Sequence, residues 1–157
     1  MRAVPTQKTF LWGGRMRLTM PLPMSYAQLD LGADMGSAGA ELGTVSLRSV
    51  SLGLGAGARW ANRTAILDLG PRLEFGWAWI RGEAGAPDVA TGSGAVLFST
   101  LGMRAALEIL AEKRLRPGIA LEGGGVLHGA RGEADGRTVI GIAGYYVIGT
   151  MAIAVSL

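Results

Sequence analysis

The last twenty residues, 138–157, alternate between bulky apolar side chains and small or weakly polar ones. A period of two belongs to a β-strand whose two faces meet different surroundings. Such a strand fits a soluble sandwich with one wet face, or a membrane barrel with lipid outside and a polar filling inside. The apolar positions are Val147, Met151, Ile153, Val155 and Leu157, and between them lie Thr150, Ala152, Ala154 and Ser156.

The same period recurs along the whole chain and predicts seven strands. Short, evenly spaced connections favour sequential antiparallel neighbours. We therefore expect one all-β domain over residues 1–157, an antiparallel up-and-down transmembrane β-barrel. The 26 glycines, scattered inside the apolar segments, fit strands that curve and pack closely. The predicted strands are 7–20, 24–36, 43–60, 63–82, 95–111, 115–129 and 138–157.

Three segments depart from this pattern. In 43–60 the apolar parity changes after Leu47, which predicts a β-bulge near Arg48–Val50. Pro71 lies on the apolar parity of 63–82 and requires an unpaired amide or a local bulge. Segment 99–116 also fits helical spacing and is rich in helix formers, so a helix stays an alternative there. A transmembrane helix over 138–157 is a further alternative.

The polar parity mixes charges of both signs with glycine, alanine and threonine. Lysine is almost absent: Lys8 and Lys113 are the two in the chain, and both fall at strand ends, unlike the outer face of a soluble sheet. In a narrow barrel the interior is just filled by side chains, so opposite charges are expected to pair there. An ion-selecting pore is the alternative. The predicted lumenal network is Arg15, Arg17, Asp30, Asp68, Arg72, Glu74, Arg104, Glu108 and Glu122, with Asp68, Arg72 and Glu74 on one strand as its best cluster.

The apolar parity carries no charge in mid-strand, and the connections alternate in length. Links at 21–23, 61–62 and 112–114 are short, whereas those at 37–42, 83–94 and 130–137 are longer or more polar. Outer-membrane barrels have short periplasmic turns and longer external loops. Interfacial aromatics should then mark the edges of the lipid, with Trp60 at the inner girdle and Trp12, Trp77 and Trp79 at the outer one.

Three stretches resemble a known kind of protein. They are Leu69-Gly70-Pro71-Arg72-Leu73-Glu74-Phe75-Gly76-Trp77-Ala78-Trp79, the turn Ala134-Asp135-Gly136-Arg137, and the closing strand from Gly144. The chain is similar to the C-terminal part of uncharacterised outer-membrane β-barrel proteins of Gram-negative bacteria, of the kind frequent in myxobacteria. The resemblance implies a bacterial outer-membrane location, a barrel, and contact with membrane lipid and the barrel assembly machinery. It implies no ligand, and the terminal Leu157 differs from the aromatic that often ends such barrels.

Signals for catalysis or cofactor binding are weak. The chain has no cysteine, and its net charge of +3 is scattered, so neither a thiolate metal site nor a nucleic-acid partner is expected. The run Gly53–Gly57 lies in mid-strand with the wrong spacing for a dinucleotide loop, and we expect it to ease the curvature of the barrel. His128 is the single histidine; with Glu133 nearby it leaves a lipid acyl hydrolase as a weak alternative, although no serine stands beside them. We expect no catalytic residue, cofactor or metal.

The sequence therefore predicts a structural or surface-interaction barrel whose lumen is filled by paired polar side chains. A small porin for solutes is the alternative, and an envelope lipid-modifying enzyme a weaker one. Seven strands leave two unpaired edges, which lipid does not tolerate. We accordingly expect an incomplete barrel, preceded in a longer product by one or more strands and a signal peptide. Self-association of two copies through open strand edges is the other solution.

Overall fold

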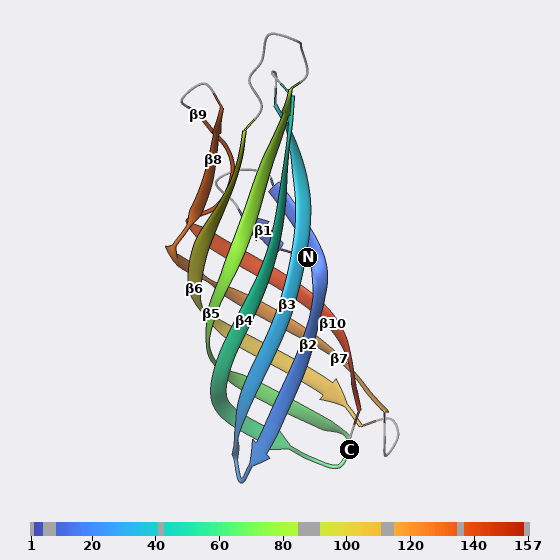
Figure 1. Cartoon of the computed structure of the whole chain (residues 1–157). Helices are drawn as coiled ribbons and strands as arrows, with labels where there is room; N and C mark the ends of the chain where they lie inside the picture. Colours follow the sequence, from blue (N-terminus) through green and yellow to red (C-terminus); the bar gives the residue numbers. More distant parts are fainter. Residues whose placement is uncertain are drawn as a thin grey trace.

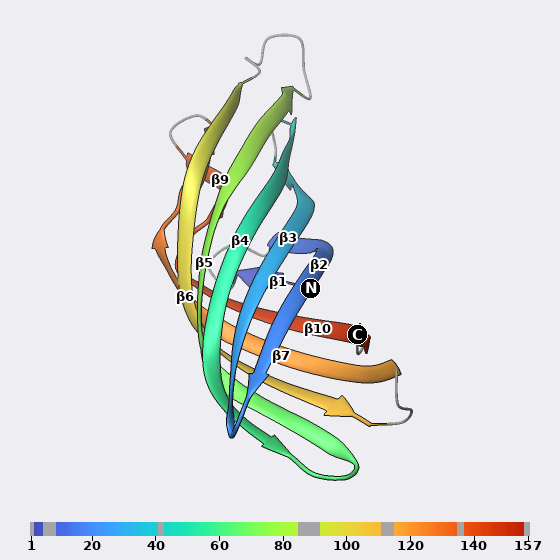
Figure 2. The same cartoon turned by 60° about the horizontal axis from the view of Figure 1, so that its bottom comes forward.

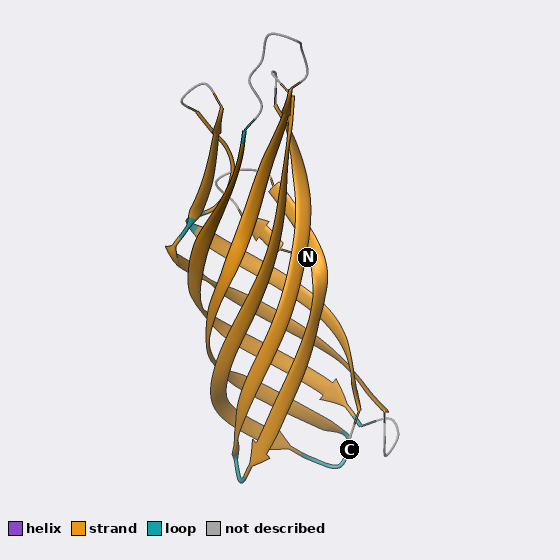
Figure 3. Ribbon diagram, in the orientation of Figure 1, coloured by secondary structure: helices purple, strands orange, loops and turns teal. Residues whose placement is uncertain are grey.

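The computed structural model describes residues 2–4, 9–40, 43–84, 92–110, 115–134 and 137–155. Within these ranges no helix has the length and apolar content needed to cross a membrane. The structure is all-β (Figure 3). Its strands are β1 (Arg2–Val4), β2 (Thr9–Leu22), β3 (Ser25–Ala40), β4 (Gly43–Ala61), β5 (Ala65–Ala84), β6 (Ser93–Ile109), β7 (Leu115–His128), β8 (Ala130–Ala134), β9 (Arg137–Ile142) and β10 (Tyr145–Val155).

Seven long strands form one antiparallel up-and-down sheet that curls into a half-barrel (Figure 1). Their order across the sheet is β10-β7-β6-β5-β4-β3-β2. The three-residue β1 pairs with both edge strands, β2 and β10, and so closes the ring at one level. The predicted all-β antiparallel sheet of seven sequential strands is confirmed.

The alternation in the sequence separates the two faces of this sheet. On β5, Asp68, Arg72 and Glu74 point into the enclosed interior, where each is at most 3% exposed. Phe75 and Trp77 point outward and are about half exposed. Successive side chains of a strand point to opposite faces, so this arrangement holds along each long strand. Charged groups are inside and large apolar groups are outside, the reverse of a soluble globular domain.

The helix alternatives are wrong. Segment 99–116 contributes to β6, which pairs with β5 on one side and with β7 on the other. Its backbone groups are satisfied by these two ladders, which outweigh the local helix propensity. Residues 138–157 are neither one helix nor one strand. The strand is interrupted at Ala143–Gly144, where Gly144 has a φ of 76°, a backbone conformation that suits glycine.

The break creates a second, small sheet. β9 pairs with β8 as a two-stranded hairpin beside the end of the long sheet that lies opposite the short connections (Figure 1). The stretch 130–137, expected to be an external loop, is therefore mostly hairpin. The link expected at 37–42 is also shorter than predicted, because β3 continues to Ala40 and pairs there with Gly43 at the start of β4.

The predicted bulge at Arg48–Val50 is wrong. β4 keeps one register with both β3 and β5 through this region. The apolar parity changes because the interior itself changes: near one end it is filled by a small apolar cluster, to which Leu47 belongs. The buried members are Leu11, Leu47, Ala78, Phe98 and Ile142.

Pro71 interrupts a ladder without shifting it. The pairing of β5 with β4 is missing opposite Ala56 and Gly57, and the same register holds on both sides of the gap. Proline lacks an amide hydrogen, so one ladder bond is lost and no extra residue is needed. A register shift in the long sheet lies elsewhere, between β6 and β7 at Ser99 and Thr100.

Candidate functional site

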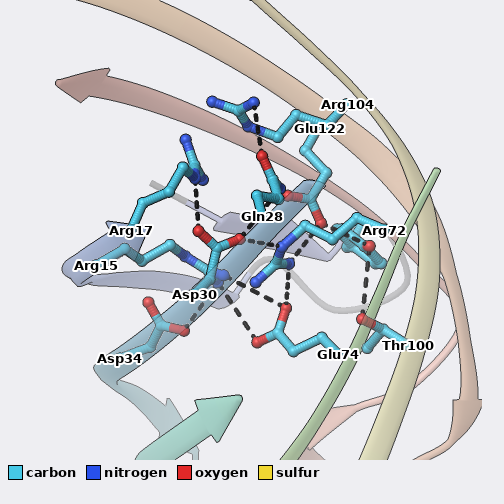
Figure 4. A network of polar contacts seen from close by, with 11 residues as sticks. Arg15, Arg17, Gln28, Asp30, Asp34, Arg72, Glu74, Thr100, Arg104 and Glu122 are labelled. Carbon is cyan, nitrogen blue, oxygen red and sulfur yellow. Dashed lines mark hydrogen bonds and ion pairs between the residues drawn. The ribbon is translucent and has the colours of Figure 1, made fainter. Parts of the chain in front are cut away.

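The interior of the half-barrel holds a network of charged side chains centred on Arg72 (Figure 4). The Arg72 side chain is 1% exposed and reaches three carboxylates. Its Nε donates to Asp30 Oδ2 at 2.7 Å, and its Nη1 donates to Glu74 Oε2 at 2.6 Å and to Glu122 Oε1 at 2.9 Å. These partners come from β3, β5 and β7, so one guanidinium ties together strands across the whole half-barrel.

Two further arginines bind the same carboxylates from the β2 side. Arg17 Nε donates to Asp30 Oδ1, the oxygen that Arg72 leaves open. Arg15 donates to Glu74 at 3.4 Å and to Asp34 at 3.5 Å. Each of the two arginines lies on the inward parity of β2, as the sequence predicts. Their side chains are 8% and 19% exposed, against 1% for Arg72, so they lie at the periphery of the network.

Neutral groups complete the network on its far side. The Tyr146 hydroxyl donates to Glu122 Oε1 at 2.9 Å, and Thr100 Oγ1 lies 3.5 Å from that hydroxyl. Arg104 Nη1 donates to Gln28 Oε1 at 3.3 Å, and Gln28 Nε2 in turn donates to Asp30 at 3.3 Å. Arg104 therefore joins the network through an amide.

The charges in this network balance. Isolated buried ions are costly, and burial is tolerated when each is paired and hydrogen-bonded. Opposite charges of equal number therefore give a neutral filling that holds several strands in one register. The cations are Arg15, Arg17, Arg72 and Arg104, and the anions are Asp30, Asp34, Glu74 and Glu122.

Two glycines of β4 make room for this filling. A Cβ on Gly53 would lie 2.4 Å from Arg72 Nη2, and one on Gly55 would lie 2.8 Å from the Gln28 amide nitrogen. Real Cβ atoms do not approach so closely, so these positions accept glycine because large side chains cross them. The run Gly53–Gly57, expected to ease curvature, thus also opens space for the network.

A second ion pair stands apart from the network. Arg59 binds Asp68 with two bonds of 2.7 and 2.6 Å, near the end of β4, and its guanidinium lies 5.8 Å from the centre of the Tyr26 ring. Asp68 was expected to join Arg72 and Glu74, but it lies four residues from Arg72 along β5 and takes Arg59 as its partner. Glu108 was also placed in the network; the structure puts it at the wall of the cleft between β2 and β10.

Several interior polar atoms have no hydrogen-bond partner among the described residues. They are Arg72 Nη2, Tyr26 Oη, Ser49 Oγ and Ser51 Oγ. Polar atoms of this kind are sites for ordered water in an interior that is otherwise polar.

Sequence reasoning missed Tyr146 and Arg59 as interior groups. Tyr146 is 1% exposed and lies on the same parity of β10 as the small residues. Since the even-numbered residues of this strand face inward, the alternation alone could have predicted its position. Arg59 lies close to the predicted link at 61–62 and was counted with that connection rather than with the interior. With the unbroken register, its odd number places it inside, on the face that also holds Ser49 and Ser51.

The tryptophans occupy two levels of the outer face. Trp60 lies beside the link after β4 and is 50% exposed. Trp77 and Trp79 lie on the far half of β5, and Trp12 lies near the start of β2; all three are exposed by 47–65%. The register places Trp12 level with Trp79, through Met35 and Arg48, and Trp60 at the other level.

His128 lies exposed at the end of β7, where the register pairs it with Ser99. A serine does therefore stand opposite it, contrary to expectation, although no hydrogen bond joins their side chains in the described structure. The Glu133 side chain lies outside the described residues. Among the described residues no group of histidines and carboxylates could hold a metal ion.

No protein-family model, curated protein or solved structure matches the chain.

Proposed function

We propose that this protein is a bacterial outer-membrane β-barrel with a structural or surface-interaction role, and that its interior is closed by the Arg72 network. One observation carries the proposal: the polarity of the sheet is inverted. The network carboxylates Asp30 and Glu74 are 0% exposed, whereas outward residues such as Met151 and Ile153 are 90% and 75% exposed. Soluble monomers rarely expose an apolar surface larger than a few hundred Å².

The height of the apolar surface fits a bilayer. On the outer face Trp60 pairs with Leu67 at one level, and Arg48 pairs with Trp79 at another. The strand rises about 40 Å between Leu67 and Trp79. At a barrel tilt of about 40° this is about 30 Å along the axis, the thickness of the hydrocarbon core. We call this outward apolar band, between the levels of Leu67 and Trp79, the belt. Arg48 is exposed on the outward face beside Trp79, so a charged residue lies where the belt ends.

The filled interior supports a structural role over conduction. A porin requires an open aqueous path, whereas here four arginines and four carboxylates lie in one connected network across the interior. We expect no conductance steps above background when the protein is inserted into planar bilayers. Regular ion-selective steps would favour the porin alternative. An enzyme remains the third possibility, and a lipid hydrolysis assay comparing the wild type with His128→Ala tests it.

The surface-interaction part of the proposal rests on the extensions beyond the belt. The hairpin β8–β9 forms a sheet of its own, separate from the barrel wall. It leaves the end of the barrel opposite the short connections (Figure 1). Its residue Ile142 packs into the apolar cluster at this end of the interior, while the rest of the hairpin lies outside the long sheet. In outer-membrane barrels the longer connections face outside.

An arginine substitution tests the lipid-facing assignment. Phe75 is 49% exposed in the middle of the belt, and Phe75→Arg should lower the free energy of unfolding in lipid vesicles by about 2–4 kcal/mol. The matched control is Glu83→Arg on the same strand and face. The Glu83 side chain is 68% exposed beyond the belt and 4.0 Å from Arg81, so its replacement should cost little. Equal tolerance of both substitutions in vesicles would contradict the membrane proposal.

A further inference from the structure

The half-barrel has an open seam between its two edge strands. The outer edge of β2 pairs with β1 from Thr9 to Leu11. The outer edge of β10 pairs with β1 at Val147 and Ile148. Beyond these residues, no described strand pairs with the outer edge of β2 over Trp12–Leu22 or with that of β10 over Met151–Val155. We call the gap between these two segments the seam.

Exposure along the seam differs from that in the rest of the interior. Gly13 and Ala152 lie on inward-facing parities, yet both are exposed. Interior positions on the central strands, such as Glu74 and Thr100, are 0% exposed. A cleft follows the seam and is lined by residues of both edges, with Arg15, Arg17 and Thr19 on one side and Gly149–Ala154 on the other. The seam therefore exposes part of the polar filling.

The short strand β1 indicates what fits the seam. Arg2 pairs with both Leu11 and Ile148, and Ala3 pairs with both Phe10 and Val147. Figure 2 shows β1 beside the upper parts of β2 and β10. β1 runs antiparallel to both neighbours, so continuing it toward its N-terminal side leads down the seam. In the same register, successive outward positions would pair with Gly14 and Met151, with Met16 and Ile153, and with Leu18 and Val155.

The faces of the two edges agree in this register. Met16 and Ile153 both point outward, at 76% and 75% exposure. One position further along, Arg17 and Ala154 both face the interior. A slip of one residue against either edge would place an outward residue beside an inward one. The offset set by β1 is thus the one that lets a single strand match both edges.

We propose that the seam is the acceptor site for one further antiparallel strand, joined to the N-terminal side of β1. Its outward residues would be bulky and apolar, to match Met16, Leu18 and Ile153. Its inward residues would be small, because Arg15 and Arg17 already fill the neighbouring space with their partners Glu74 and Asp30. The strand would supply hydrogen bonds to the open backbone groups of both edges, which an edge strand otherwise leaves unpaired.

Covalent continuity with β1 distinguishes this occupant from a second copy. β1 already fills the end of the seam, so an incoming strand has to end where β1 begins and run in the same direction. Joining the two makes the pairing intramolecular and raises its effective concentration. A second copy would offer one edge strand to one edge of the seam and leave the other edge open.

Disulfide trapping in the cysteine-free chain tests the proposal. A strand of about six residues, apolar and small in alternation, is added directly ahead of Met1 of the full chain. It carries one cysteine at the position predicted to pair with both Met16 and Ile153. Met16→Cys and Ile153→Cys are each combined with it, and Met20→Cys on the same face of β2 is the control. The variants are folded in detergent micelles and oxidised, and the products are separated on non-reducing gels.

The expected result is an intramolecular disulfide with both Met16→Cys and Ile153→Cys, formed at least ten times faster than with Met20→Cys. An extension with its apolar and small positions exchanged should lose this preference. Equal rates at all three sites, or disulfide-linked dimers in place of intramolecular bonds, would overturn the proposal. If the extended variants refold poorly, the same strand is added as a peptide to the folded Met16→Cys chain. A disulfide that depends on the peptide's pattern supports the acceptor site, and its absence overturns it.

Discussion

Replacing Arg72 with methionine removes the cation that three interior carboxylates share. Asp30 keeps a hydrogen bond from Arg17, and Glu74 keeps one from Arg15. Glu122 keeps the hydrogen bond from the Tyr146 hydroxyl, and the nearby cation Arg104, opposite it on β6, makes no direct ion pair with it among the described contacts. Breaking a buried ion pair by removing one member typically costs about 3–5 kcal/mol, because the other charge is left uncompensated. We expect Arg72→Met to lower the free energy of unfolding by an amount in this range, with most of it arising at Glu122.

A double-mutant cycle isolates that contribution. Glu122→Gln in the Arg72→Met background removes the uncompensated charge, so the double variant should be more stable than the sum of the single effects predicts, by about 1–3 kcal/mol. Unfolding by guanidinium in detergent or vesicles is followed by the fluorescence of the four tryptophans. These lie on the outer face, so the substitutions leave the reporter groups in place.

The matched control uses a carboxylate on the same strand. Asp68 pairs with Arg59, and it lies about 13 Å from Arg72 along β5. Arg72→Met and Asp68→Asn should therefore be additive within about 0.5 kcal/mol. If the cycle with Glu122 is additive as well, Arg72 and Glu122 are not energetically coupled and the network argument fails. If the cycle with Asp68 shows the larger coupling, the partners described here are wrong.

Two further substitutions test the packing of the interior. Gly53→Ala places a Cβ 2.4 Å from Arg72 Nη2 and should lower the free energy of unfolding in guanidinium by about 1–3 kcal/mol. In the control Gly125→Ala the new Cβ meets no atom within 4 Å, so stability should change by less than about 0.5 kcal/mol. Similar losses for the two variants would refute the close-approach argument. Tyr146→Phe removes the donor to a buried carboxylate and should cost about 1.5–3 kcal/mol. Tyr145→Phe, at a hydroxyl on a side chain that is 77% exposed, should be nearly neutral in the same measurement, and an equal loss at both positions would contradict the assigned hydrogen bond.

The period of two was sufficient to predict most of the fold. Strands alternate their side chains strictly, so the residues themselves indicated which face each one takes. Strand β5 is one example. The structure places its apolar residues Leu67, Phe75 and Trp77 outside and its charged residues Asp68, Arg72 and Glu74 inside. Short connections then favoured sequential pairing, because few other topologies can be built with them.

Local pattern failed where the interior changes character. Leu47 faces inward because the apolar cluster of Leu11 and Phe98 lies across the interior from it, and the sequence of one strand does not show what lies opposite. For the same reason the change of apolar parity after Leu47 suggested a bulge that β4 does not have. At 99–116 local propensity left a helix open, and the ladders on both sides of β6 decided against it.

The sequence by itself therefore determined most of the long strands, their order and the face on which most charges lie, because all three depend on periodicity and connection length. Only the tertiary structure decided which charges meet. Arg72 reaches Asp30 and Glu122 across 42 and 50 residues of chain, and Asp68, on its own strand, belongs to Arg59 instead. Partner choice depends on the curvature of the sheet and the stagger between strands, which bring distant residues to one level. The open seam between β2 and β10 likewise depends on how the sheet curls, which brings its two edge strands face to face. Neither edge strand differs in sequence pattern from the central strands.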